Sequence, residues 1–165
     1  MPNVLTIALI PLLPLAGFLL LGLFGKKFPG NSAGAIGTLL LLISFVLAAY
    51  TAYDYFSHSY VGFYPRLVPF KYTWLEFSPE VSIDIGIMLD PISAMMIVVV
   101  TFVSLMVHIY SLTYLKGEKR FSTYYSFLAL FTFSMLGLVL SSNIFQIYIF
   151  WELVGVSSFL LFGFY

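Results

Sequence analysis

The sequence predicts an all-α integral membrane protein with about five transmembrane helices and an external β-hairpin between the second and third helices. Two properties of the composition indicate a membrane environment: 61% of the 165 residues are hydrophobic and only 8% are charged. Soluble domains are about 25% charged, so these few charges cannot cover a water-facing surface. The third observation is the spacing of five apolar stretches, each close to the ~20 residues that a membrane-spanning helix needs.

The first two helices are expected at residues 4–24 and 34–53, separated by a short loop that contains proline and glycine. Pro11 and Pro14 indicate a kink or an irregular start in the first helix, which neighbouring helices can compensate. A secretory signal peptide is the alternative for this stretch. No lysine or arginine precedes the apolar run and no A-x-A cleavage pattern follows it, which disfavours that alternative.

The one long polar interval, residues 54–90, predicts a β-hairpin outside the membrane. Residues 81–89 alternate between aliphatic and other side chains with a strict period of two. Residues 71–77 are rich in strand-forming types, and Ser-Pro-Glu at 78–80 supplies the turn. Because an isolated two-stranded hairpin is marginally stable in water, we expect its apolar face to lie on another surface.

Three more helices follow the hairpin. Asp90 is expected to cap the third helix, with Pro91 at its first position, and this helix continues to about Leu115. The fourth and fifth helices are predicted at 122–140 and 144–165. Only a short Ser-Ser-Asn link separates them, so they must be antiparallel.

The basic residues predict the orientation. Five of the seven fall in two short loops that lie on one side, and two fall in the polar interval. The first group is Lys26, Lys27, Lys116, Lys119 and Arg120, and the second is Arg66 and Lys71. The positive-inside rule places the two loops in the cytoplasm, with the N-terminus and the hairpin outside. Because the last apolar run ends without a basic flank, we expect the chain to be the leading portion of a longer polypeptide.

Composition also excludes several classes of function. A formal net charge of zero argues against nucleic-acid binding through phosphate neutralisation. The absence of cysteine excludes iron–sulfur clusters and disulfides within this chain. His58 and His108 lack the spacing of a metal or haem site, and no glycine-rich phosphate-binding motif is present. Any chemistry that this chain supports must therefore use protons, ions or the cofactors of partner subunits.

The leading candidate residue is Glu152, the single carboxylate in the apolar stretch YIFWELVGVSSFLLFGFY (148–165). At ~1.5 Å per residue it lies ~12 Å into its helix, close to the membrane midplane. A charged residue there costs about 2.5–3.5 kcal/mol, and burial disfavours the ionised form. A role in proton exchange would explain why so costly a residue is present. Tyr148 offers a hydroxyl one turn away. The alternative is a protonated acid that only holds helices together.

His108 is a second, weaker candidate near the cytoplasmic end of the third helix. It is interpreted as an interfacial histidine that reaches water, with a role in proton entry as the other hypothesis. Asp84 and Asp90 are interpreted as hairpin and cap residues. The loop KGEKR (116–120) is interpreted as solvated, with lipid contact as its alternative.

Several motifs resemble a known family. Residues 88–96 (MLDPISAMM) and 107–165, where WE-x-VG is followed by S-x-LL-x-GF, are similar to the start of the antiporter-like membrane subunit of respiratory complex I, called L in bacteria and chain 5 in mitochondria. The resemblance covers nearly the whole chain and implies the leading part of a larger antiporter-like fold. Residues 1–87 then hold the first two helices and the hairpin, and residues 88–165 hold the start of a proton-channel repeat.

In that family the glutamate of the WE pair is the intramembrane proton-channel residue, and it maps onto Glu152. The resemblance implies a proton-translocating subunit of NADH:quinone oxidoreductase, in which Glu152 is loaded and unloaded in a half-channel. It implies no cofactor in this chain, with NADH, FMN, Fe–S clusters and quinone in partner subunits. The other membrane-arm subunits and the lipid bilayer are the expected partners. The expected location is the bacterial inner membrane, or the mitochondrial inner membrane if the gene is organellar.

Two positions depart from the family pattern. Leu153 stands where many complex I chains have glycine, and Phe159 stands where tyrosine is common. The large subunit of multisubunit Na+/H+ antiporters is also similar and uses WEL, so it is the alternative function. The motifs DPIS (90–93) and VGVSS (154–158) favour complex I. A membrane scaffold without transport is the third hypothesis.

Overall fold

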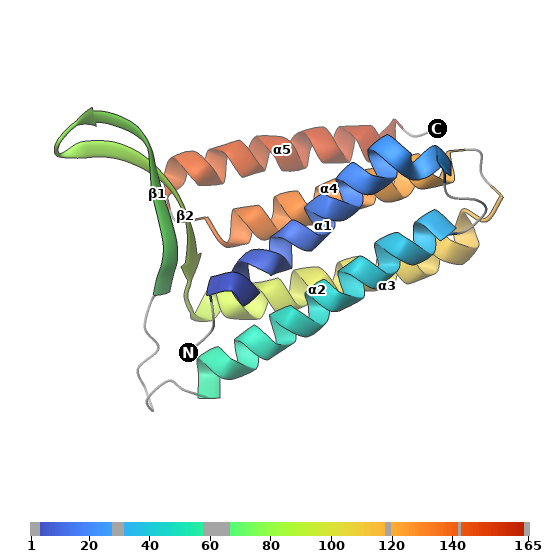
Figure 1. Ribbon diagram of the computed structural model, residues 1–165, viewed down its shortest axis with the longest axis horizontal. Coiled ribbons are helices and arrows are strands. Elements are labelled where there is room, and N and C mark those ends of the chain that lie inside the picture. Colours follow the sequence, from blue (N-terminus) through green and yellow to red (C-terminus); the bar gives the residue numbers. More distant parts are fainter. Residues whose placement is uncertain (1–3, 28–31, 58–66, 118–119, 142, 164–165) are drawn as a thin grey trace.

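The structure is a computed structural model that describes residues 4–27, 32–57, 67–117, 120–141 and 143–163. Five long helices run roughly side by side, and a two-stranded hairpin lies across one end of them (Figure 1). The helices are α1 (Val4–Phe24), α2 (Ser32–Ser57), α3 (Pro91–Tyr114), α4 (Phe121–Val139) and α5 (Ile144–Phe162), with a short 3-10 turn, η1 (Gly25–Lys27), after α1. The strands are β1 (Leu67–Ser78) and β2 (Val81–Leu89).

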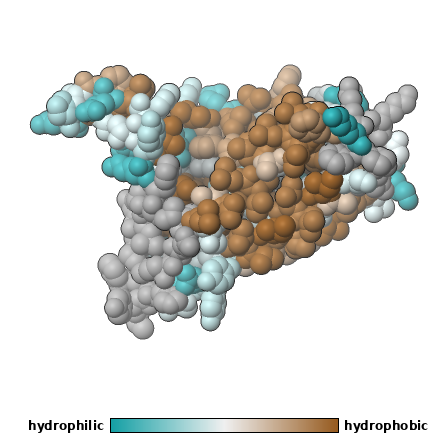
Figure 2. Space-filling view, viewed as in Figure 1, coloured by the Kyte–Doolittle hydropathy of each residue, from teal (hydrophilic) through white to brown (hydrophobic). Residues whose placement is uncertain are grey.

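All five helices are long and apolar enough to cross a membrane. Figure 2 shows hydrophobic side chains covering the helices, with hydrophilic ones gathered at the hairpin and at the opposite end. The chain is therefore a multi-pass membrane protein, as predicted. The expected ranges agree with the helices to within a few residues, except that α2 extends beyond 34–53 at both ends.

α4 is the central helix of the bundle. It packs on α1, α3 and α5, while α1 also packs on α2, and α2 on α3. Helices from residues 1–87 and from 88–165 therefore pack on one another. A cluster of buried side chains that includes Leu89 and Leu140 fills the hairpin end, and a second that includes Leu115 and Phe121 fills the other end.

The prolines of α1 are accommodated by a neighbouring helix. α1 continues through Pro11 and Pro14 without a break. Proline has no backbone N–H, so Pro14 leaves the carbonyl of Ile10 without its usual helical donor. The hydroxyl of Ser44, from α2, donates to that carbonyl at 2.6 Å. The expected compensation by a neighbouring helix is confirmed for Pro14.

The two basic loops lie at the same end of the bundle. η1 touches the start of α4, since a Cβ added to Gly25 would lie 2.7 Å from the Cβ of Ser122. The hairpin lies at the opposite end, together with the start of α1 (Figure 1). The predicted grouping of the basic loops is thus confirmed, although Arg66 and Lys119 lie outside the described residues.

The hairpin is antiparallel, with Tyr72 opposite Ile85 and a turn at Pro79 and Glu80 as predicted. Its first strand is longer than the predicted 71–77. Only the base of the hairpin is covered: Leu89 is buried, whereas Val81 is 56% exposed. The tip extends past the helices (Figure 1), so the alternating apolar face is not covered along its full length.

Candidate functional site

α5 packs on α4 through one face only. The side chain of Phe150 lies on Gly137, where a Cβ would come within 2.3 Å of the ring. Ser157 is fully buried, donates to the carbonyl of Leu153 at 2.8 Å, and lies 3.4 Å from the hydroxyl of Ser134. The hydroxyl of Ser157 is thus directed to backbone and to an adjacent helix.

Glu152 lies on the opposite, outer face of α5. Its side chain is exposed, and Tyr148, one turn earlier, is 64% exposed. Among the described residues, none forms a hydrogen bond or ion pair with Glu152. The expectation of a buried glutamate is therefore not met within this chain, because α5 turns its other face to α4. Gly155 also borders open space, since a Cβ there would meet no atom within 4 Å.

A lone carboxylate on the outer face of an apolar helix has limited chemistry. In the hydrocarbon region its ionised form is unfavourable, so it is stable there only when protonated, paired or hydrated. It can therefore hold and release a proton wherever a donor or a water chain reaches that face. Tyr148 lies four residues before Glu152, on the same side of the helix, and its hydroxyl is the polar group that α5 itself offers there.

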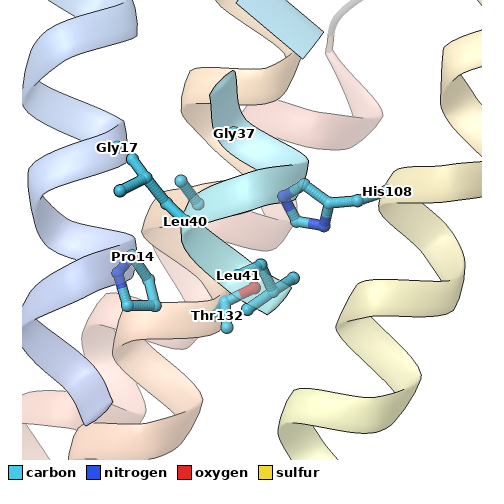
Figure 3. Close-up of a pocket in the computed structure, with 8 residues that line it drawn as sticks. Pro14, Gly17, Gly37, Leu40, Leu41, His108 and Thr132 are labelled. Carbon is cyan, nitrogen blue, oxygen red and sulfur yellow. The ribbon is translucent and has the colours of Figure 1, made fainter. Parts of the chain in front are cut away.

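His108 does not reach water in this structure. Its side chain is 1% exposed, and its ring packs edge-on against Tyr125, 5.4 Å between centroids. Figure 3 shows the imidazole directed from α3 toward Gly37 and Leu41 of α2. The interpretation of His108 as an interfacial histidine was therefore wrong. It assumed a side chain that follows the helix end outward, whereas the ring is directed into the bundle, where it packs on Tyr125 of α4.

Hydrogen bonds hold His108 in place. Its Nδ1 lies 2.7 Å from the carbonyl oxygen of Ser104; a carbonyl only accepts, so Nδ1 carries the hydrogen. The hydroxyl of Tyr125 donates to the carbonyl of His108 at 2.6 Å. The hydroxyl of Thr132 donates to that of Ser104 at 3.1 Å. The first bond lies within α3, and the other two tie α3 to α4.

Two spaces adjoin His108. The one in Figure 3, between α1, α2 and α4, is too narrow for a water molecule. The other, of about 310 Å³, lies between α3 and α4 and contains the hydroxyl-bearing residues Ser104 and Thr132. Among the described residues of α5, only Leu161 lines it; Leu161 is nine residues after Glu152 and ~13 Å further along the helix. The structure thus brings Tyr148 and Glu152 together but leaves His108 apart from them.

Gln146 is a residue that the sequence argument missed. It is 8% exposed, and its side-chain amide makes two hydrogen bonds to the backbone of one residue of β2: the Gly86 N–H donates to Oε1 at 3.0 Å, and Nε2 donates to the Gly86 carbonyl at 2.8 Å. A long amide within an apolar span is the same kind of signal that singled out Glu152. Here the amide makes a polar contact between α5 and β2, outside the helix bundle.

The two aspartates have the expected structural roles. Asp90 caps α3 by accepting from the N–H of Ser93 at 2.7 Å, with Pro91 at the start of the helix. Asp84 pairs with Lys71 across the hairpin at 3.2 Å. The hydrogen bond from the Lys71 ammonium lowers the pKa of Asp84 below its usual value.

Metal binding has no support in the described part of the chain, where no three His, Asp or Glu side chains are grouped as ligands would be. The candidate site therefore consists of Glu152 with Tyr148 on the outer face of α5. His108 forms a separate buried group near the loop end.

Comparisons with known proteins bear on this arrangement. Residues 74–125 match the family model described as NADH-Ubiquinone oxidoreductase (complex I), chain 5 N-terminus. NADH-quinone oxidoreductase subunit L of Neisseria meningitidis serogroup A is 42% identical over 158 residues, which are 95% of this chain and 23% of the relative. NAD(P)H-quinone oxidoreductase subunit 5 from chloroplasts of Chara vulgaris is 38% identical over 168 residues, 95% of this chain and 24% of the relative. The chain thus spans about a quarter of these relatives.

A solved structure shares the fold. It is the membrane-bound sulfane sulfur reductase, described as an archaeal respiratory membrane complex, and its matching chain superposes with a TM-score of 0.76 at 16% identity. The match covers 93% of this chain and 29% of the other. The arrangement of five helices and one hairpin is therefore found in a respiratory membrane assembly.

Proposed function

Because this chain is homologous over 95% of its length to the N-terminal part of the subunit L and subunit 5 chains of NADH-quinone oxidoreductases, we propose that it is the leading part of a proton-translocating membrane-arm subunit of such a complex. The enzyme as a whole transfers electrons from NADH to quinone in other subunits. This chain contributes a proton path and no redox group. Its surroundings are the other membrane-arm subunits and a bacterial or mitochondrial inner membrane, with the hairpin on the outside.

The observation that carries the proposal is the place of Glu152. It is the only charged residue of α5, it stands far from either end of that helix, and its side chain faces away from α4. At the contact between α4 and α5, the buried hydroxyls of Ser134 and Ser157 both have partners within the chain. Glu152 has none among the described residues, which leaves it available to a half-channel formed with the protein that follows or adjoins α5.

Tyr148 and His108 take supporting roles. Tyr148 shares the outer face of α5 with Glu152. Its hydroxyl can relay a proton along that face. His108 borders the cavity between α3 and α4 at the end of the basic loops. In this proposal it exchanges a proton with water that enters this cavity from the cytoplasmic side.

The energy for transport must come from elsewhere. Moving one elementary charge against 100 mV costs about 2.3 kcal/mol, and no described residue of this chain can supply it. The state of Glu152 must therefore be driven by conformational or electrostatic changes in partner subunits that carry the redox reaction.

The test is Glu152→Gln in the assembled complex, with protons translocated per electron as the measurement. We expect the yield to fall strongly while assembly is little changed, because an amide keeps the size of the side chain but cannot exchange a proton. Glu152→Asp should retain part of the yield.

Glu80→Gln is the matched control, since Glu80 is an exposed glutamate in the hairpin turn outside the membrane. A normal proton yield in Glu152→Gln would refute the proposal. A defect in assembly alone would support the scaffold hypothesis, and a yield that depends on sodium would support the Na+/H+ antiporter alternative.

A further inference from the structure

α5 is the least supported helix of the bundle, although it carries the candidate proton site. Only 11% of its apolar window is buried within the chain, compared with 50% for α4. In the described part of the structure its principal helical neighbour is α4. The position of Glu152 therefore depends on a few contacts, and one of them comes from outside the helix bundle.

That contact is the base of the hairpin. The two hydrogen bonds between the Gln146 side chain and the backbone N–H and C=O of Gly86 imitate the pairing of a neighbouring strand. Beside them, the N–H of Met88 donates to the carbonyl of Leu140 at 2.9 Å, and the side chain of Asn143 donates to the carbonyl of Asp84. The free edge of β2 is thus joined to the α4–α5 link and the first turn of α5.

Asn143 and Gln146 are also connected to each other. Asn143 caps α5 by accepting from the N–H of Gln146 at 2.9 Å. The start of α5 is therefore held from two directions, along its axis by the cap and sideways by the hairpin. Gln146 precedes Glu152 by six residues, ~9 Å along the helix, so a rotation or shift at Gln146 is passed directly to Glu152.

We propose that Gln146 is a positioning residue: its paired hydrogen bonds to Gly86 set the rotation and depth of α5, and they couple Glu152 to whatever moves or holds the hairpin outside the membrane. This inference rests on the proposed proton role of Glu152. It adds a mechanical link between the external hairpin and the intramembrane acid. A small displacement of β2 changes the environment of Glu152, because α5 moves as a rigid helix and transmits the displacement from Gln146 to Glu152.

The test compares variants of Gln146 in the assembled complex. Gln146→Met keeps the length of the side chain and removes both hydrogen bonds. We expect a loss of protons translocated per electron, and a shift of the infrared C=O stretching band of Glu152, which is assigned from its loss in Glu152→Gln. Ile147→Met places the same side chain at the next position, outside the bonds to Gly86, and should leave both readouts unchanged.

Gln146→Glu separates positioning from packing. A protonated carboxyl can donate to one oxygen and accept from one N–H, as the amide does, whereas a carboxylate can only accept. The yield of Gln146→Glu relative to the native protein should therefore recover as the pH falls, while Gln146→Met stays low at every pH. α1 and α4 carry no titratable acid or lysine that would interfere. The charged residues of the hairpin are Lys71, Glu76, Glu80 and Asp84.

The outcomes are distinct. A native band and native yield in Gln146→Met, or a relative yield of Gln146→Glu that does not depend on pH, would overturn the positioning role. If Glu152→Gln itself keeps a normal yield, the proposed function fails. The band position in Gln146→Met then still decides whether Gln146 positions Glu152.

Discussion

α4 and α5 are adjacent helices of 19 residues each, and both are apolar enough to span a membrane. They differ in whether their polar side chains have hydrogen-bond partners within the chain. On α4, the hydroxyls of Tyr125, Thr132 and Ser134 all bond within the chain. On α5, Glu152 points outward with no partner among the described residues. Satisfied polar groups hold helices together, whereas an unsatisfied acid in a membrane span indicates a task that needs something beyond this chain.

The largest effect is expected where the two helices meet. In Gly137→Ala, the new Cβ would lie 2.3 Å from the ring of Phe150, so either that ring or α5 itself must shift. Overpacking of this kind costs about 1–3 kcal/mol. We expect a lower thermal midpoint and less assembled complex, measured on the detergent-solubilised protein.

Gly155→Ala on the outer face of α5 sharpens that result. No atom of the described chain lies within 4 Å of the added Cβ, so the chain by itself predicts no loss. If Gly155→Ala is as damaging as Gly137→Ala, the outer face of α5 is covered by other protein in the assembled complex. Equal, native-like stability of both variants would contradict the close contact of α4 and α5.

A matched pair of tyrosines gives the next largest effect. Tyr125→Phe on α4 removes the hydrogen bond to the carbonyl of His108 and should cost about 1 kcal/mol, as a buried hydrogen bond typically does. Tyr148→Phe on α5 loses an exposed hydroxyl, so we expect little change in stability and a modest fall in proton yield. Thermal unfolding and proton yield, measured on both variants, test the contrast. The reverse pattern would place the functional hydroxyl on α4.

A smaller effect is expected at the kink of α1. Ser44→Ala removes the donor to the Ile10 carbonyl, which Pro14 leaves without a helical partner. Hydrogen bonds between membrane helices average about 0.6 kcal/mol, so the thermal midpoint should fall slightly and the proton yield should not change. A loss of proton yield without a loss of stability would show that this contact does more than compensate for proline.

Helix ranges were predictable from sequence because the lengths of the apolar runs and local signals such as Asp90 followed by Pro91 determine where helices begin and end. The burial of His108 and the exposure of Glu152 were not. Helical periodicity shows which residues share a face, but it does not show which face is covered by a neighbour. That depends on distant packing, such as Phe150 on Gly137. The contact of Gln146 with Gly86 joins positions 60 residues apart, which no local pattern encodes.

The smallest effect is expected when the pH is lowered, in the hairpin and in the support that it gives to α5. The pKa of Asp84 is lowered from 3.8 by its hydrogen bond with Lys71, so the ion pair contributes fully above that value and its contribution disappears only as the pH falls through the lowered pKa. Lys71 is 63% exposed, so the contribution is small. Hydrogen exchange of the hairpin amides, corrected for intrinsic rates, should be unchanged from neutral to mildly acidic pH.

The variant Lys71→Met removes the ion pair. Because the bonds that hold α5 involve the backbone of Gly86 and Asp84, they should persist in this variant. Loss of hairpin protection near neutral pH would mean that a different titrating group controls the attachment of α5.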